Sequence, residues 1–506
     1  MQPSFITPSS LPPARSHQQQ HKMPLFKAQI TMDRVIKTAD RILELVSTAV
    51  MTLTGYLTSF ALSFTISRVL LVSILLPLYL CKLVLTLIPS ILRNVTQLFA
   101  PNGWNRLVES AESYRAQSDS LAYAQLNGSY KFRPDELFHI PEKSRGWMEN
   151  VPYANDTHSF TVCGATVRYI HLKPSYSSIL QDGKKTHRPI VLLHGNPSWS
   201  YMWRNVFPSL LEQGHEVYAI DWLGHGRSDK ILKPEAISFE LHVRTLMDFF
   251  ETTNLEDAII AAHDWGGCVA LCTLPRLPTS SCESVFLLNT FFPPRLSDAT
   301  LHYRLLNRAW YCTTGLLKGY TPESAAIRFI TPTISQSDAE AYSGPYKGLP
   351  RSAKSSIERF SHITPSLPRV ILHRARNLQV WKLAEGLCGP SHFDTLNTQA
   401  RLSAQDELVR KFWSSKEQAH GFEVAVIFGD KDPLVRDYKN VLVREIAPEL
   451  MVKWAPRGLW IPGAGHMPTE DRAGDVARLI ARFARKEEGK SQKSQKSEER
   501  ENGEAS

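Results

Sequence analysis

Asp264 stands at a point in the sequence that favours a nucleophile. It lies in "AIIAAHDWGG", between an apolar run typical of a buried strand and a stretch typical of a helix. Its small neighbours Ala262 and Gly266 permit a sharp strand-turn-helix, a geometry that projects one reactive side chain. A carboxylate attacking an acyl carbon would form an anhydride, so Asp264 is better suited to an sp³ carbon that carries a leaving group. The predicted intermediate is an alkyl ester of Asp264.

Hydrolysis of such an ester requires a base, and the base requires an acid that orients it. His466 lies in the Gly-rich stretch "IPGAGHMPTED", and two acids lie in "FGDKDPLV" after an apolar run. Asp432 is favoured as the acid because it stands third after Gly429, and Asp430 is the alternative. Taken alone, a loop histidine or an aspartate in a turn is more often structural. The order of nucleophile, acid and histidine along the chain predicts a catalytic triad.

The stretch "VLLHGNPSWSYMWR" supplies candidate donors. A backbone N–H near Asn196 and that of Trp265 would hold the oxyanion formed when water attacks the ester. A halide leaves as an anion and needs only donors in a dry cavity, which the Asn196 amide and the Trp265 indole can provide. An epoxide oxygen would need an acid, commonly a tyrosine. The sequence leaves five tyrosines open for that role: Tyr303, Tyr311, Tyr320, Tyr342 and Tyr346.

The elements that must position these residues alternate in type. "SFTVCGATVRYIHL" predicts a hairpin, and "PIVLLHG", "EVYAID", "AIIAAH" and "VFLLNT" predict short buried strands separated by helices. This pattern is typical of an α/β fold with a mainly parallel sheet and helices on both faces. The alternation stops from about residue 293 to residue 422 and resumes at "EVAVIFG". We predict that this long insertion forms a lid over the active site.

The chain before this unit contains an apolar region. The stretch Leu45–Ser67 carries no charge over 23 residues, long enough to cross the hydrocarbon core of a bilayer. A second apolar run, residues 69–92, is interrupted by Lys82 and two prolines, which leaves a second span, a re-entrant piece and an interfacial helix open. Two buried soluble helices are the alternative. We predict a membrane protein with one or two N-terminal spans, the endoplasmic reticulum being a candidate membrane; its facing side stays open.

The sequence of 506 residues divides into several parts. No apolar run of signal-peptide length follows Met1, and the polar ends are predicted to be disordered. No fold is predicted for the connector. The predicted parts are a disordered segment 1–41, an anchor 42–93, a connector 94–150, a catalytic domain 151–485 and a disordered tail 486–506.

Charge and cysteine content exclude other classes. The net charge is +9, but Lys and Arg are scattered among Asp and Glu, so nucleic acid is not an expected partner. Seven cysteines without a CxxC pair argue against a zinc site or a disulfide scaffold. Because the triad and water supply all the chemistry, no metal and no organic cofactor is expected.

Five sequence blocks together resemble one family. "HGNPSWSYMWR", "DWLGHGRSDK", "HDWGG", "FGDKDPLV" and "GAGHMP" resemble the haloalkane dehalogenases of the α/β-hydrolase fold, with the epoxide hydrolases as close relatives. The resemblance implies Asp264 as nucleophile, His466 as base and Asp432 as acid, with Asn196 and Trp265 binding the halide. Epoxide hydrolases usually carry an aromatic residue where Asn196 stands. In some members the acid follows the sixth strand, where this chain has Asn289.

Three functions remain after this reading. The first is a membrane-tethered, haloalkane dehalogenase-like hydrolase that acts on a small hydrophobic substrate. The second is an epoxide hydrolase that uses the same triad. The third is a catalytically silent binding module with this fold, against which the complete set of Asp264, Asp432 and His466 argues.

Overall fold

The computed structural model describes most of the predicted connector and catalytic domain. The predicted terminal segments and the apolar run Leu45–Ser67 fall almost wholly outside the described residues. Among the helices that are described, none combines the length and the apolar character needed to cross a membrane. The described ranges are 94–140, 151–175, 187–293, 322–363, 378–388 and 390–485, with isolated residues at 38, 42, 77, 78, 81, 85, 91, 92, 295, 298, 314 and 319.

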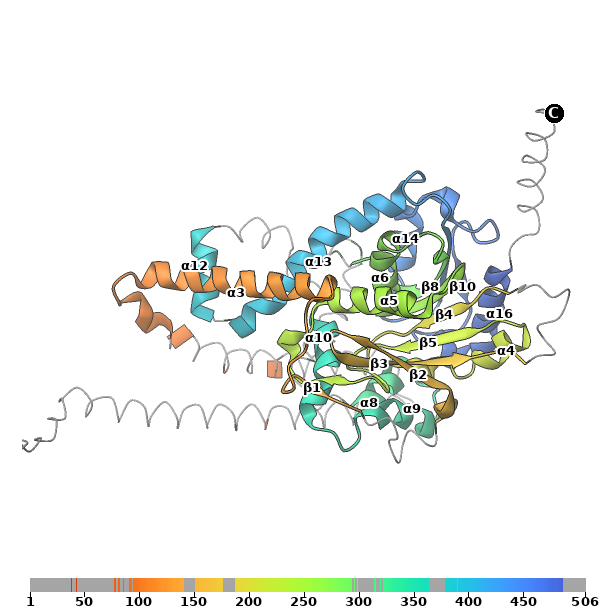
Figure 1. The fold of residues 1–506 in the computed structure, drawn as a ribbon, viewed down its shortest axis with the longest axis horizontal. Coiled ribbons are helices and arrows are strands. Elements are labelled where there is room, and N and C mark those ends of the chain that lie inside the picture. Colours follow the sequence, from red (N-terminus) through yellow and green to blue (C-terminus); the bar gives the residue numbers. More distant parts are fainter. Residues whose placement is uncertain are drawn as a thin grey trace, which may run out of the picture.

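An eight-stranded sheet forms the centre of the molecule, in the order β10-β9-β8-β7-β4-β5-β3-β2 (Figure 1). Strands β10, β9, β8, β7, β4 and β5 run parallel to one another, whereas β3 pairs antiparallel with both β5 and β2. The predicted hairpin and the mainly parallel sheet are thereby confirmed. The strands are β2 Thr157–Val162, β3 Ala165–Leu172, β4 Ile190–Leu193, β5 Val217–Asp221, β7 Ala258–Asp264, β8 Cys282–Thr290, β9 Glu423–Gly429 and β10 Leu459–Ile461, and β1 Leu137–Phe138 pairs separately with β6 Lys230–Ile231.

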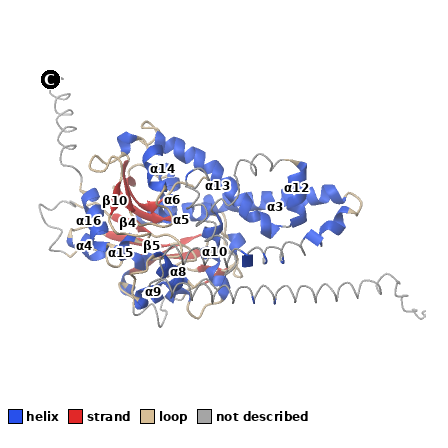
Figure 2. Ribbon diagram, turned by 180° about the vertical axis from the view of Figure 1, so that it is seen from behind, coloured by secondary structure: helices blue, strands red, loops and turns tan. Residues whose placement is uncertain are grey.

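Helices cover both faces of the sheet, as the alternating pattern predicts (Figure 2). Successive side chains of a strand point to opposite faces, so Val191 and Leu193 of β4 join one hydrophobic core and Ile190 and Leu192 join the other. All four are fully buried, which explains why the strand reads as a continuous apolar run. The first core is covered by α5 (Phe239–Thr253), α6 (Trp265–Thr273) and α14 (Tyr438–Glu445), and the second by α4 (Phe207–Glu212) and α16 (Ala473–Ala484).

Helix α5 illustrates how local sequence sets the ends of an element. The Ser238 hydroxyl accepts a hydrogen bond from the Leu241 backbone N–H at the start of the helix. At the other end Asn254 takes a left-handed conformation with φ 48°, which stops the helix. The helix is thereby held at the length that covers the sheet beside α6.

The insertion between β8 and β9 is helical over its described part. One of its helices, α10, reaches the carboxyl ends of the strands, since its Ile357 carbonyl accepts a hydrogen bond from Asn196. The described helices are α8 (Glu323–Ile330), α9 (Gln336–Ser343), α10 (Ser355–Ile363), α12 (Gln379–Cys388) and α13 (Pro390–Ser414), and a short helix α15 (Pro468–Asp471) lies between β10 and α16.

The predicted connector contains a long helix, α3 (Gly103–Leu126), for which the sequence indicated no fold. It lies beside α12 and projects from the core with it (Figures 1 and 2). Lys382 of α12 pairs with Glu112 of α3 at 2.6 Å. At the end nearer the sheet, Gln125 Nε2 donates to the Ala236 carbonyl at 2.8 Å. The connector helix therefore packs against both the insertion and the hydrolytic core.

Candidate active site

Asp264 stands on a strained turn at the end of β7. Its backbone has φ 52° and ψ −124°, a region that side-chain-bearing residues rarely adopt and that clusters at functional sites. The loop after β4 passes very close to this turn. A Cβ added at Gly195 would lie 2.3 Å from Asp264 Oδ1, and one added at Gly266 would lie 2.6 Å from the His194 carbonyl oxygen. Thr290 Oγ1 donates to the Asp264 carbonyl at 2.5 Å and fixes the turn. The small residues around Asp264 are therefore required by close approach.

Two backbone donors contact the Asp264 carboxylate. The Asn196 N–H donates to Oδ1 at 3.0 Å, and the Trp265 N–H also hydrogen-bonds the carboxyl group. These are the two donors expected to form an oxyanion hole. Asp264 itself is 6% exposed, so the carboxylate depends on these groups and on His466 in place of water.

The three predicted triad residues lie in contact. His466 Nε2 is 3.6 Å from Asp264 Oδ2, and its Nδ1 is 3.0 Å from Asp432 Oδ2. The alternative acid, Asp430, accepts instead from the Gly463 N–H at 2.7 Å. Asp432 is thus the acid that contacts the imidazole.

Asn289 holds Asp432 in this position, a role that the sequence reading did not assign. Its Nδ2 donates to Asp432 Oδ2 at 2.6 Å and to the Gly465 carbonyl at 3.0 Å, directly before His466. Asp432 Oδ1 accepts from two backbone N–H groups, those of Leu434 and Val435. The signal in the sequence was the position of Asn289 at the end of the apolar run "VFLLNT", because the ends of adjacent parallel strands meet at one edge.

The site is electrostatically coupled through His466. Burial raises the pKa of Asp264 and that of Asp432, but the positive charge and hydrogen bonds of His466 outweigh burial, so both pKa values lie below the usual range. Burial by itself lowers the pKa of His466. The charge of Asp432 and the hydrogen bonds to both carboxylates have the larger, opposite effect and raise this pKa to about 10. These shifts favour two carboxylates around one imidazolium in the resting site.

The two predicted halide donors, Asn196 and Trp265, both contact helix α10 of the insertion. Asn196 Nδ2 donates to the Ile357 carbonyl of α10 at 3.1 Å. The Trp265 indole contacts Phe360 of the same helix, with ring centroids 5.4 Å apart, and Phe291 at 5.1 Å. An apolar wall from α10 and from the end of β8 therefore surrounds the indole.

Two of the five candidate tyrosines are described, and both are engaged elsewhere. Tyr342 Oη donates to Glu470 Oε1 at 2.5 Å, and Tyr346 Oη donates to the Gly224 carbonyl at 3.0 Å. Burial raises the pKa of each phenol well above its usual value. The other three, Tyr303, Tyr311 and Tyr320, lie outside the described residues.

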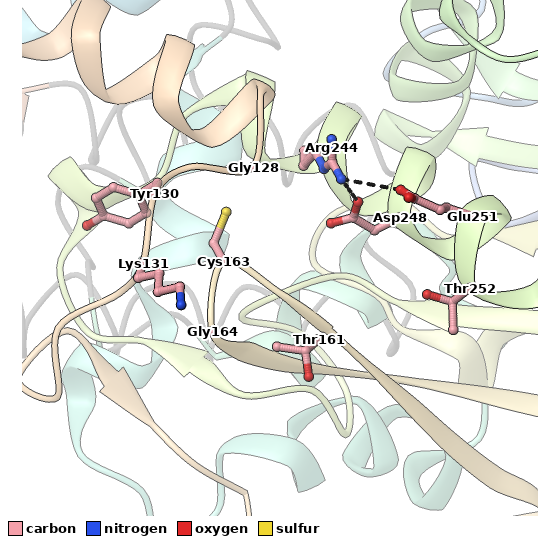
Figure 3. Close-up of a pocket in the computed structure, with 10 residues that line it drawn as sticks. All are labelled: Gly128, Tyr130, Lys131, Thr161, Cys163, Gly164, Arg244, Asp248, Glu251 and Thr252. Atoms are coloured by element: carbon pink, nitrogen blue, oxygen red, sulfur yellow. Dashed lines mark hydrogen bonds and ion pairs between the residues drawn. The ribbon is translucent and has the colours of Figure 1, made fainter.

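A surface pocket of about 440 Å³ lies away from this site (Figure 3). It is formed between the β2–β3 turn, at Cys163 and Gly164, and helix α5. Three of its charged residues pair with one another, because Arg244 contacts both Asp248 and Glu251. None of the residues that line it belongs to the triad or contacts Asp264 in the described structure, so the pocket is separate from the candidate active site.

Comparison with known proteins agrees with the fold. Residues 188–313 match the family model of the alpha/beta hydrolase fold. The chain is 38% identical over 210 residues to a haloalkane dehalogenase of Mycobacterium marinum, covering 40% of this chain and 67% of that protein. A haloalkane dehalogenase of Psychrobacter cryohalolentis is 29% identical over 189 residues, 37% of this chain and 60% of that protein. One of Mycolicibacterium paratuberculosis is 39% identical over 99 residues, 20% of this chain and 33% of that protein.

The fold and the matched residues define an α/β-hydrolase. Within that class the chain belongs to the haloalkane dehalogenase family, as the resemblance of the five sequence blocks predicts. The matched segments span a third to two thirds of the length of these relatives.

Proposed function

We propose that this protein is a hydrolase that forms and then hydrolyses an alkyl ester of Asp264, with haloalkanes as the substrate class. The observation that carries the proposal is the Asp264 carboxylate on a strained turn, 3.0 Å from the Asn196 N–H and 3.6 Å from His466 Nε2. The names of the relatives at 38% and 29% identity point to the same chemistry.

In the first step Asp264 attacks the carbon that bears the halogen. A bond forms between a carboxylate oxygen and that carbon, and the halide leaves with the electron pair of the broken bond. The lowered pKa of Asp264 keeps the nucleophile ionised. The Asn196 amide and the Trp265 indole would receive the halide as N–H donors in a site closed to bulk water.

In the second step His466 acts as the base. Esterification removes the negative charge of Asp264, which is one of the causes that raise the His466 pKa, so the imidazolium loses its proton to solvent. Neutral His466 then takes a proton from water as the oxygen attacks the ester carbonyl, and the N–H groups of Asn196 and Trp265 hold the oxyanion. Collapse breaks the bond between the carbonyl carbon and the alkyl oxygen. That oxygen takes the remaining proton of the added hydroxyl, which releases the alcohol and restores the Asp264 carboxylate. The net reaction converts a haloalkane and water into an alcohol, a halide and a proton.

The substrate class follows from the surroundings of Asp264. The site is almost fully buried, and Phe291 and Phe360 flank Trp265. Such a wall favours an apolar alkyl chain, with polarity confined to the leaving group.

Epoxide hydrolysis is the second candidate, and one observation weighs against it. Opening an epoxide produces an alkoxide that needs an acid. Of the five tyrosines considered, the two that are described donate to Glu470 and to the Gly224 carbonyl. A silent binding module is the third candidate. It gives no reason for the strained Asp264 or for the Asn289 bridge that supports Asp432.

The test is to trap the ester in the His466→Ala variant of the full chain. On treatment with 1-bromohexane, intact mass should rise by one hexyl group with release of one bromide, and peptide mapping should locate the adduct on Asp264. The matched control, Asp264→Asn with His466→Ala, should gain no mass. A mass gain from styrene oxide alone would assign an epoxide hydrolase, and no adduct from either reagent would refute the proposal.

Membrane attachment through residues 42–93 stays a prediction from the sequence. The uncharged run Leu45–Ser67 is the basis for it. After alkaline carbonate extraction of expressing cells, the full chain should remain in the membrane pellet and a chain starting at residue 94 should not. Release of both into the supernatant would contradict the prediction.

A further inference from the structure

We infer that His225 is a positioning residue, which orients the Asn196 amide as a donor for the departing halide. The inference rests on the proposed function, because it assigns a supporting partner to the halide site of that reaction. It starts from a contact that the sequence reading did not anticipate: His225 Nε2 lies 3.1 Å from Asn196 Oδ1.

The orientation of the Asn196 amide is fixed from the other side. Its terminal nitrogen faces the Ile357 carbonyl oxygen of α10 at 3.1 Å. A carbonyl oxygen only accepts hydrogen bonds, so the amide NH₂ must face Ile357, and Oδ1 must therefore face His225. The reversed amide would bring two oxygens together.

The same reasoning fixes the proton on His225. Because Asn196 Oδ1 only accepts, His225 Nε2 must carry the hydrogen. Burial, with His194 and His242 close by, lowers the pKa of His225 well below its usual range, so the ring is neutral and has a single N–H. The other tautomer would donate from Nδ1 to the Leu223 carbonyl over a longer 3.4 Å and would leave two lone pairs facing each other at Nε2.

The His225 ring cannot easily move away from this contact. It is fully buried, and its ring centroid lies 5.5 Å from that of His194 and 5.5 Å from that of Phe360. The backbone is also held, since its N–H donates to the Trp222 carbonyl at 2.8 Å and its own carbonyl accepts from Lys230 Nζ at 3.1 Å. Lys230 is buried as well, so this loop forms a rigid support.

A donor at Oδ1 has a chemical consequence for the other end of the amide. Accepting a hydrogen bond at oxygen polarises the group and strengthens donation from Nδ2. It also prevents the amide from rotating about its side-chain bond when a halide arrives beside Trp265. Among the described residues, the contacts of the His225 side chain include Asn196 and none of Asp264, Asp432 and His466, so its effect should be confined to the step in which the halide leaves.

The test compares His225→Met with His225→Gln in the full chain. The glutamine amide can restore a donor toward Asn196 Oδ1, whereas methionine cannot. In His225→Met, formation of the Asp264 ester should slow about tenfold and the inhibition constant of bromide at fixed ionic strength should rise about tenfold, as expected for one lost hydrogen bond. His225→Gln should recover most of both, and single-turnover hydrolysis of the ester should stay unchanged in both variants.

The matched control is His215→Met. His215 is also buried, and its Nδ1 bonds the Arg188 carbonyl at 3.0 Å, away from Asn196. This variant should keep the parent bromide inhibition. If His225→Met behaves like His215→Met, or if it slows ester hydrolysis as much as ester formation, the positioning role is refuted.

A second readout does not depend on turnover. Nitrogen-15 NMR of the histidine-labelled chain, with His225 assigned by its loss in His225→Gln, should show the proton on Nε2. A proton on Nδ1 would overturn the inference. A His466→Ala variant that stays unmodified in the 1-bromohexane experiment would refute the proposed function instead, so the two failures are distinguishable.

Discussion

His466 lies between two carboxylates, and only one of them keeps its charge through the proposed cycle. Asp432 stays ionised and bonded to Nδ1 at 3.0 Å, whereas Asp264 loses its charge when it is alkylated. The raised pKa of His466 thus belongs to the resting state and falls once the ester forms. In the proposed cycle, alkylation of Asp264 therefore lowers the His466 pKa and favours the neutral base at the step that needs it.

At the residue scale, we predict that Asp432→Asn slows ester hydrolysis by about 10³-fold or more, as expected when an oriented base loses its carboxylate partner. Because the charge of Asp432 raises the His466 pKa, its loss should also move the acid limb of the hydrolysis rate to lower pH. Single-turnover rates between pH 5 and 9 measure both effects, with Asp430→Asn as the control. An acid limb that stays at the same pH would contradict this account.

At the scale of elements, the turn between β7 and α6 depends on the loop after β4. Gly195 allows that loop to bring the Asn196 N–H to the carboxylate, because a Cβ at position 195 would lie 2.4 Å from the Asp264 Cβ. Neither element can hold the catalytic geometry without the other, since the Asn196 backbone N–H of the loop bonds the Asp264 carboxylate on the turn.

We predict that Gly195→Ala lowers the rate of ester formation at least about 100-fold, because Asp264 or the loop must move by more than an ångström to admit the methyl group. Bromide release measures this rate, and circular dichroism should show a retained fold. The matched control is Gly474→Ala, where the new Cβ would meet nothing closer than Arg478 Nη1 at 3.7 Å. Equal activity of the two variants would show that the close approach is unimportant.

The elements also mark how far the sequence could predict the structure. Strands such as β4 and β7 coincide with continuous apolar runs, and the turn at Asp264 needs only local small residues, so both could be predicted. The His225–Asn196 contact joins residues 29 apart, and the Asn289–Asp432 contact joins residues 143 apart. The first contact depends on how a loop folds over the finished sheet, and the second on which strand end and loop become neighbours at its edge, so a local pattern can mark Asn289 as a candidate but cannot fix either contact.

At the scale of the whole molecule, several histidines are buried in the neutral state. Burial lowers the pKa of His194 to about 4, that of His263 to about 4 and that of His242 to about 3. His466 is the opposite case, because its neighbours raise its pKa. In acid, His194, His263 and His242 disfavour folding, because they bind protons in the unfolded chain but not in the folded one. In alkali, His466 loses its proton and no longer stabilises the folded state. The free energy of unfolding should therefore be largest near neutral pH.

We predict that the stability falls as the pH is lowered from about 6.5 to about 4, where the unfolded histidines bind protons and the folded ones do not. Each group contributes a slope of about 1.4 kcal/mol per pH unit. Neither ring nitrogen of His242 has a hydrogen-bond partner among the described residues, so His242→Phe should reduce the slope. Thermal unfolding between pH 4.5 and 7 measures it, with exposed His420→Gln as the control. An unchanged slope in His242→Phe would contradict the prediction.

The pairing of α3 with α12 has a consequence for the order of events during synthesis. Glu112 and Lys382, which pair across these helices, are 270 residues apart. Translation proceeds at roughly 5 to 20 residues per second, so α3 leaves the ribosome tens of seconds before its partner exists. During that interval the sheet up to β8 can assemble while α3 still lacks α12. The projecting pair of helices is therefore completed only after the central sheet has gained most of its strands, and until then the face of α3 that packs on α12 stays uncovered.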